Sequence, residues 1–363
     1  MPRRGAASEA RRTTRKDDEM PDTVIPTIDL QPLLAGTDGG LERVAGEVLD
    51  VYSNVGFAYL TNHGIPDALI AGLFAASARF HALPRDVKLE IEINEYHRGF
   101  IPINTSTDTT TRLATVTKPE QSESFMVMHE LAPDDPDVRA GAFLAGPNQW
   151  PASLPRFEPA VRAYEAAAAG LARELVRVVA VALGLAPDAL DRHFARPTTF
   201  LRLLSYPARP PHSPDDLYGS SPHTDYGFLT LLLQDDAGGL QVRSPDGTWL
   251  DAPPLPGSFV MNSGDMLHRM SNGRLLSTPH RVINRSGRAR YSCPYFFDTD
   301  LRSIIEPCAS WVGPDDPARF DPLVYGDFVA EQLRAHHDQH AKRAWPNSQR
   351  SRTRSRSPAS SRE

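Results

Sequence analysis

Apolar residues recur at helical spacing in three stretches of the first half of the chain. The longest stripe alternates spacings of three and four residues through Val161, Tyr164, Ala168, Leu171, Leu175, Val178 and Ala182, and Gly184 follows it. Shorter stripes lie in residues 41–52 and in residues 69–80, the latter after Pro66, a residue type favoured at helix starts. This periodicity predicts three helices that each bury one face, and the longest should lie along a flat surface.

Near Phe200 the pattern changes to short β-rich runs punctuated by turns. The runs are FLRLLSYP, FLTLLLQ, GLQVR, TWLDAPP, SFVMN, HRVINR and RYSCPYFF, and GG, PDG, SGD and SNG stand between them. Strands at this spacing indicate a β-sandwich or a barrel.

Charge is distributed unevenly along the chain. Residues 1–20 carry a net charge of +2 and residues 342–363 a net charge of +6, so the total of −6 leaves residues 21–341 at −14. Such an acidic core is a poor partner for nucleic acid or for an anionic membrane. No apolar run reaches the ~18 residues that cross a bilayer, and the first twenty residues lack the apolar segment of a secretory signal. Two cysteines provide no disulfide framework, so we expect a cytoplasmic protein, and a monomer is compatible with the sequence.

Candidate chemistry begins at the segment HTD, at the head of an apolar run. His223 and Asp225 are two residues apart, so on an extended chain their side chains project from the same face, roughly 7 Å apart. A buried carboxylate needs a partner or a metal ion, and either a hydrogen-bonded pair or a metal site fits these residues. A second such triplet, His336 and Asp338, lies in a helical context, where residues two apart point away from each other.

His280, in STPHRVINR, stands at the start of another strand and could meet this pair in a barrel. Two histidines and one carboxylate form the facial triad that suits non-haem Fe(II), whereas a structural zinc site closes with four ligands. Ten residues later, Arg290 and Ser292 share one strand face and could form a fork for a carboxylate, although a surface salt bridge would also explain Arg290.

In combination, HTD at 223–225, STPH ending at His280 and RYS at 290–292 resemble the iron- and 2-oxoglutarate-dependent oxygenases related to isopenicillin N synthase. The resemblance covers about residues 24–300 in the family's order. It includes IPTIDL at 25–30, GFAYLTNHGIP at 56–66, FHALP at 80–84 and FVMNSGDMLHRMSNG at 259–273.

The resemblance implies an α+β protein whose core is a double-stranded β-helix, or jelly roll, backed by N-terminal and interdomain helices. We expect a disordered basic N-terminus at 1–20, a helical or α+β region at 21–198 that packs on the barrel, and a catalytic core at 199–300. A C-terminal helical segment at 301–341 and a disordered Ser/Arg-rich tail at 342–363 would complete the chain.

The resemblance also implies the ligands of the site. Fe(II) would be held by His223, Asp225 and His280, and Arg290 and Ser292 would hold the distal carboxylate of the cosubstrate 2-oxoglutarate. Tyr206 matches a family tyrosine that helps to bind this carboxylate, although the asparagine that the family usually has two positions earlier is Leu204 here.

Arg98, Phe100 and Phe125, in HRGFIP and SESFMV, are the residues that we expect at the substrate mouth. Asn262 precedes the tight SGD turn, so turn formation is its expected role, with the orientation of a metal ligand as the alternative.

The expected reaction consumes O2 and 2-oxoglutarate, releases succinate and CO2, and hydroxylates, desaturates or cyclises a small-molecule metabolite, typically of secondary metabolism. Three alternatives remain open from the residues: an oxidase without 2-oxoglutarate, an ethylene-forming enzyme of the same family, and a non-catalytic ligand sensor. A metal hydrolase would need a general base beside the metal, and the sequence has no HExxH segment.

Overall fold

The structure is a computed structural model that describes residues 25–106, 111, 113–210, 212–214 and 216–336. The two segments expected to be disordered, 1–20 and 342–363, lie outside these residues, as do the side chains of His336 and Asp338. No helix among the described residues is long and apolar enough to span a membrane.

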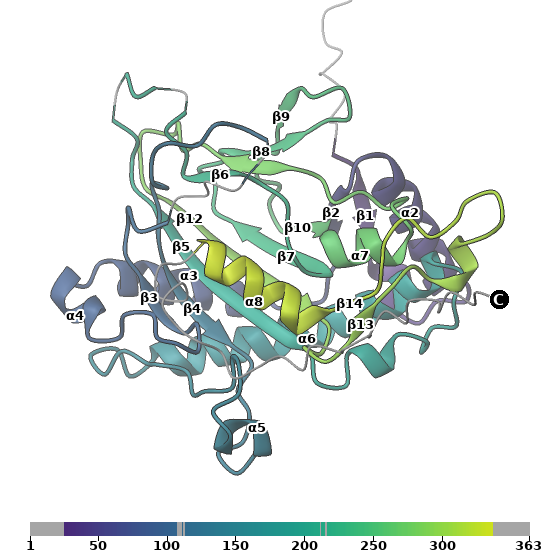
Figure 1. Ribbon diagram of the computed structural model, residues 1–363. Coiled ribbons are helices and arrows are strands. Elements are labelled where there is room, and N and C mark those ends of the chain that lie inside the picture. The colour runs from purple at the N-terminus through teal and green to yellow at the C-terminus, as the bar shows by residue number, and fades with distance from the viewer. Residues whose placement is uncertain (1–24, 107–110, 112, 211, 215, 337–363) are drawn as a thin grey trace, which may run out of the picture.

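Helices occupy both ends and the middle of the chain (Figure 1). They are α1 (Gln31–Leu34), α2 (Gly40–Asn54), α3 (Asp67–His81), α4 (Arg85–Leu89), α5 (Pro136–Arg139), α6 (Phe157–Ala182), α7 (Asp265–Met270) and α8 (Tyr325–His336), with short 3-10 turns at Asp191–His193 and Ala309–Trp311.

The strands before residue 200 are β1 (Thr27–Asp29), β2 (Phe57–Thr61), β3 (Gly99–Ile101), β4 (Glu123–Met128) and β5 (Thr198–Tyr206). Those that follow are β6 (Ser220–His223), β7 (Leu229–Gln234), β8 (Leu240–Arg243), β9 (Trp249–Asp251), β10 (Phe259–Ser263), β11 (His280–Val282), β12 (Arg290–Asp298), β13 (Ile304–Ile305) and β14 (Leu323–Val324).

Two sheets form the centre of the molecule. The large sheet has the strand order β1-β2-β10-β7-β12-β5-β4-β3, and the small sheet has the order β6-β11-β8-β9. Figure 1 shows the small sheet lying across from β7, β10 and β12. Four strands of the large sheet come from residues 27–128, so the N-terminal part of the chain builds the same sheet as the later strands.

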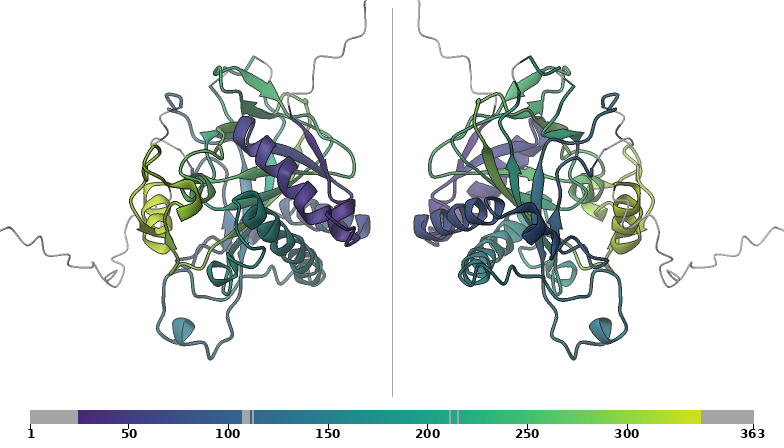
Figure 2. Two further views of the ribbon diagram at one scale, coloured as in Figure 1. Left: turned by 90° about the vertical axis from the view of Figure 1, so that its right-hand side faces the viewer. Right: turned by 90° about the vertical axis from the view of Figure 1, so that its left-hand side faces the viewer.

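The three helices expected from the apolar stripes form as α2, α3 and α6. All seven residues of the longest stripe are buried in α6, because their spacing keeps them on the helix face that packs against β7 and β12. Figure 2 shows these three helices together on one side of the sheets and α8 on the other side.

Most buried apolar side chains of the described residues fill two separate layers. The larger cluster lies between the helices and the large sheet and includes Phe80, Phe100, Phe125 and Phe157. The smaller cluster includes Leu204, Tyr206, Val242 and Val282 from facing strands of the two sheets. Both faces of the central strands are therefore buried, which explains their nearly continuous apolar sequences.

Candidate metal and cosubstrate site

Two histidines face each other across the small sheet. His223 ends β6 and His280 begins β11, and antiparallel pairing places them directly opposite one another, with ring centroids 4.3 Å apart. The Nδ1 of His223 lies 2.6 Å from the carbonyl oxygen of Ser221, and the Nδ1 of His280 lies 3.3 Å from that of Thr278. A carbonyl only accepts hydrogen bonds, so each Nδ1 carries the proton and each Nε2 keeps its lone pair.

Asp225 completes the group from the loop after β6. Its Oδ1 lies 3.8 Å from the Nε2 of His223 and 3.7 Å from the Nε2 of His280. Its Oδ2 accepts hydrogen bonds from Thr230 Oγ1 at 2.5 Å and Asn262 Nδ2 at 2.7 Å. Thr230 and Asn262 are themselves paired between β7 and β10, so the large sheet holds one carboxylate oxygen and turns the other toward the histidines.

Burial and local charge act in opposite directions on these groups. Burial raises the pKa of Asp225, but the two histidines and the hydrogen bonds from Thr230 and Asn262 lower it to below its ordinary value overall. Burial is the main cause that lowers the pKa of His280 to about 4, and the neighbouring His223 is the second cause. A deprotonated carboxylate and a neutral imidazole are the forms that bind metal ions.

The ligand atoms of the three residues all lie within 4.8 Å of one another. Two imidazole nitrogens and one carboxylate oxygen on one side of an ion leave further positions open, which is the donor set of non-haem Fe(II) sites. Among the described residues no cysteine takes part in the group, because Cys293 and Cys308 are free and lie elsewhere. The residues present therefore fit Fe(II) as the sequence predicted.

A second polar group lies deep between the two sheets. Arg290 is fully buried, and its terminal nitrogens donate to Ser292 Oγ at 3.1 Å and Gln234 Oε1 at 3.3 Å. Its guanidinium carbon lies 4.6 Å from the ring centroid of Tyr206, whose hydroxyl lies 3.4 Å from Ser292 Oγ. The period of two thus places Arg290 and Ser292 on one face, as expected.

Arg290 lacks a counter-charge in the described part of the chain. Its contacts are neutral oxygens and an aromatic ring, and its buried Nε has no hydrogen-bond partner. A buried cation without a carboxylate is costly, so this site is built for an anion that comes from outside the chain. The distal carboxylate of 2-oxoglutarate fits it.

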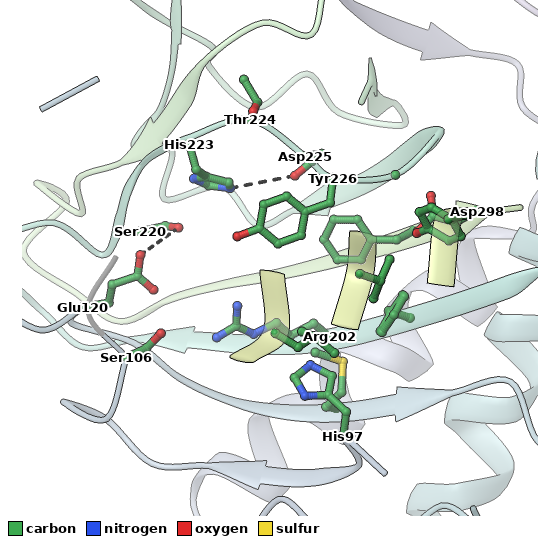
Figure 3. Close-up of a pocket in the computed structure, with 17 residues that line it drawn as sticks. His97, Ser106, Glu120, Arg202, Ser220, His223, Thr224, Asp225, Tyr226 and Asp298 are labelled. Atoms are coloured by element: carbon green, nitrogen blue, oxygen red, sulfur yellow. Dashed lines mark hydrogen bonds and ion pairs between the residues drawn. The ribbon is translucent and has the colours of Figure 1, made fainter. Parts of the chain in front are cut away.

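A cavity of about 170 Å³ opens at His223 and Asp225. Figure 3 shows His223, Asp225 and Tyr226 on one wall and Arg202 and His97 opposite. Its apolar walls are made by Met126, Phe200, Phe296, Val329 and Leu333. Arg290, Ser292 and Tyr206 do not line it, so the buried Arg290 group lies outside this cavity.

The three residues expected at the substrate mouth, Arg98, Phe100 and Phe125, do not line this cavity. Phe100 and Phe125 pack against Phe80 in the core on the helix side of the sheet, and both are buried. Arg98 is fully buried and donates to the carbonyl oxygens of Tyr96 and His129. Adjacent residues of a strand face opposite sides, so Met126 rather than Phe125 faces the cavity.

Asn262 also differs from its expected role. It lies within β10 rather than in the turn, and it donates directly to Asp225. Thr230 and Gln234 likewise support the two polar groups, although the sequence analysis did not single them out. Arg202 was missed as well, and its signal was present: it is the only charged residue in the apolar run FLRLLSYP.

Comparisons with known proteins agree with this geometry. Residues 198–299 match the family described as the 2OG-Fe(II) oxygenase superfamily, and residues 25–153 match the non-haem dioxygenase in morphine synthesis N-terminal family. The 2-oxoglutarate-Fe(II) type oxidoreductase hxnY of Emericella nidulans is 34% identical over 85% of this chain and 89% of its own length. The chain belongs to the 2OG-Fe(II) oxygenase superfamily. It is an enzyme that uses Fe(II) and 2-oxoglutarate, as the resemblance implied.

Further members of the superfamily show the same likeness. Homoarginine-6-hydroxylase 2-ODD-C23.2 of Arabidopsis thaliana is 34% identical over 78% of this chain and 80% of its own length. The crystal structure of a full-length Neurospora crassa protein in complex with alpha-KG and thymine has a TM-score of 0.76 and 30% identity, over 86% of this chain and 96% of that chain. The likeness to solved structures of 2OG oxygenases confirms the expected jelly-roll fold.

Proposed function

We propose that this member of the superfamily hydroxylates a C–H bond of a small-molecule metabolite. The observation that carries the proposal is that two of the three metal ligands, His223 and Asp225, line a cavity with mostly apolar walls, whereas the buried Arg290 lies outside that cavity. In this arrangement Arg290 would bind the cosubstrate, and the cavity beside His223 and Asp225 would take the substrate.

The roles of the residues follow from their atoms. His223 and His280 would hold the iron through Nε2 and Asp225 through Oδ1, while Arg290 and Ser292 would hold the distal carboxylate of 2-oxoglutarate, with Tyr206 beside them. When bound, iron supplies the activation of O2, so that substrate R–H, O2 and 2-oxoglutarate become R–OH, succinate and CO2. The protein binds and orients the substrate and the cosubstrate, and it excludes water from the site.

The size of the cavity supports a small substrate. Its volume of about 170 Å³ is close to the ~150 Å³ of an engineered cavity that holds benzene, so it accommodates a group of about one ring. Similar proteins are named for small molecules of different kinds, such as homoarginine for an Arabidopsis relative and thymine in the Neurospora crassa complex. We infer a role in secondary metabolism, which is supported by 36% identity to the 2-oxoglutarate-dependent dioxygenase citB of Monascus ruber.

The direct test measures succinate released from 2-oxoglutarate by purified protein with Fe(II) and O2. Release should require 2-oxoglutarate, and His280→Ala should abolish it because one of two neutral nitrogen ligands is lost. His193→Ala is the matched control, since His193 is half-buried in a 3-10 turn and does not line the cavity. Substrate-dependent O2 uptake without 2-oxoglutarate would refute the proposal, and so would full activity of His280→Ala.

We also propose that the enzyme works in the cytoplasm. Cys293 is buried and Cys308 is half-buried, and both are free thiols, which a reducing compartment maintains. Fractionation of the source cells, with antibody detection of the protein, tests this location.

A further inference from the structure

Arg202 lines the cavity with a guanidinium whose terminal nitrogens have no hydrogen-bond acceptor among the described residues. It lies on β5, on the strand face shared with Phe200, and Figure 3 shows its guanidinium pointing into the same space as His223. Its Nε donates to the fully buried Ser124 Oγ at 2.8 Å, which orients the planar group. Within the described residues, Ser124 is its only hydrogen-bond acceptor, and no carboxylate forms an ion pair with it.

This orientation leaves the two terminal nitrogens side by side and available. A guanidinium whose Nε is occupied still offers two parallel N–H groups at its end, the geometry that binds a carboxylate through both oxygens. A half-buried guanidinium held in this way loses part of its hydration without gaining a counter-charge from the protein. The missing partner is therefore an anionic group of a ligand in the cavity.

The rest of the cavity limits what that ligand is. Glu120 lines the same space, and its Oε1 accepts a hydrogen bond from the backbone N–H of Ser221 at 2.7 Å, while the described residues provide no partner for its Oε2. Glu120 and Arg202 form no ion pair with each other, so both charges act on a bound ligand separately. A carboxylate placed at Glu120 would be repelled. The remaining walls are mainly apolar.

We propose that the substrate is a small monocarboxylic acid with an apolar body, and that Arg202 binds its carboxylate. The proposal rests on the proposed function, because it names the substrate class of that same site. Arg202 and Arg290 then have separate anions: Arg290 holds the cosubstrate in the closed site, and Arg202 holds the substrate in the cavity.

The test is a binding titration that does not depend on turnover. Protein loaded with Mn(II) and 2-oxoglutarate without O2 is titrated by calorimetry with phenylacetate, indole-3-acetate and hexanoate, and with the primary amide of each acid. These probes offer Arg202 one carboxylate on three apolar bodies. At least one acid should bind at least about tenfold more tightly than its amide, because the amide lacks the charge.

Variants then assign the effect to Arg202. Arg202→Gln should weaken binding of that acid by about 10- to 100-fold, to the level of its amide, and Arg202→Lys should recover part of the loss. Arg162→Gln, which changes a half-buried arginine of α6 on the helix side of the sheet, is the matched control and should bind the acid like wild type. The 2-oxoglutarate requirement of Arg202→Gln should change less than threefold.

Glu120 supplies a second, independent arm. Phenylmalonate, which is phenylacetate with a second carboxylate, should bind more weakly than phenylacetate because Glu120 repels that carboxylate. Glu120→Gln should reduce the difference in affinity between the two compounds, while its amide oxygen still accepts the hydrogen bond from the Ser221 N–H. The proposal is overturned if no acid binds wild type, if amides bind as tightly as acids, or if Arg202→Gln mainly raises the 2-oxoglutarate requirement. Equal binding of phenylmalonate and phenylacetate overturns the restriction to monocarboxylates. Absence of succinate release by wild type would instead refute the proposed function.

Discussion

Replacing Asn262 by leucine should weaken metal binding although Asn262 itself does not face the metal position. Asn262 is 2% exposed, and its Nδ2 donates to Asp225 Oδ2 at 2.7 Å, which turns Oδ1 toward the two histidines. Leucine has a similarly branched side chain but no donor, and the control below separates the loss of the hydrogen bond from the change in packing. Thr230 remains as the second donor to the same oxygen.

The expected magnitude follows from the loss of one donor to a buried charged acceptor. Such a hydrogen bond contributes roughly 1.5–3 kcal/mol, which corresponds to about 10- to 100-fold in the dissociation constant of the metal. Asn262→Asp should be worse than Asn262→Leu, because a second carboxylate would face Asp225. Calorimetric titration of the apoprotein with Mn(II), together with thermal unfolding of each variant, measures both effects.

Asn272→Leu is the matched control for this experiment. Asn272 is also fully buried and donates through Nδ2, but to the carbonyl oxygens of Trp311 and Pro317. Its replacement should lower the unfolding temperature and leave the metal dissociation constant within twofold of wild type. The reasoning is refuted if Asn262→Leu also binds Mn(II) within twofold of wild type, or if Asn272→Leu loses as much affinity.

Three further predictions test other parts of the structure. Arg290→Ala should raise the 2-oxoglutarate concentration needed for half-maximal succinate release by ~30- to 1000-fold, which corresponds to a loss of roughly 2–4 kcal/mol of binding free energy. Arg290→Lys should recover part of this loss, and an unchanged 2-oxoglutarate requirement in Arg290→Ala would contradict the anion site. Burial is the main cause that raises the pKa of Glu165 from 4.5 to about 7, so the folded protein holds a proton that the unfolded chain releases, and stability falls as the pH rises from about 4.5 to 7. Glu165→Gln should therefore stabilise the protein by about 2–3 kcal/mol at pH 8 and by little at pH 5 in urea unfolding, and equal effects at both pH values would disprove this. Tyr325→Phe removes the donor that bonds Asp298 Oδ2 at 2.8 Å, so urea unfolding should show a loss of roughly 1–3 kcal/mol, whereas wild-type stability would show that this bond does not anchor α8.

Much of the metal site followed from local sequence, because strand geometry is local. His223 and Asp225 are two residues apart, and Arg290 and Ser292 share one strand face for the same reason. The structure brings the triad together as the sequence predicted and places Tyr206 beside the Arg290 group. The three helices could also be predicted from their apolar stripes, since a 3.6-residue periodicity is visible in the sequence whatever surface the helix packs against.

Contacts between side chains from distant parts of the chain could not be predicted from local sequence. Asn262 and Asp225 are 37 residues apart and meet only because β10 pairs with β7, which positions Asn262 opposite Thr230. The sequence around Asn262 favoured a turn, and nothing local could reveal a carboxylate from another loop.

The cavity proposed for the substrate depended most on tertiary structure. Phe125 and Met126 are adjacent in an apolar strand with two buried faces, so the sequence could not show which side faces the core and which the cavity. Antiparallel pairing with β5 decided it, by placing Met126 opposite Arg202 and Phe125 opposite Leu203. Residue chemistry and spacing were enough to predict which residues could bind a metal and an anion, because both are local properties of the chain. Which arginine faces the cavity depended on the folded sheet, because strand register selects the side to which each side chain points.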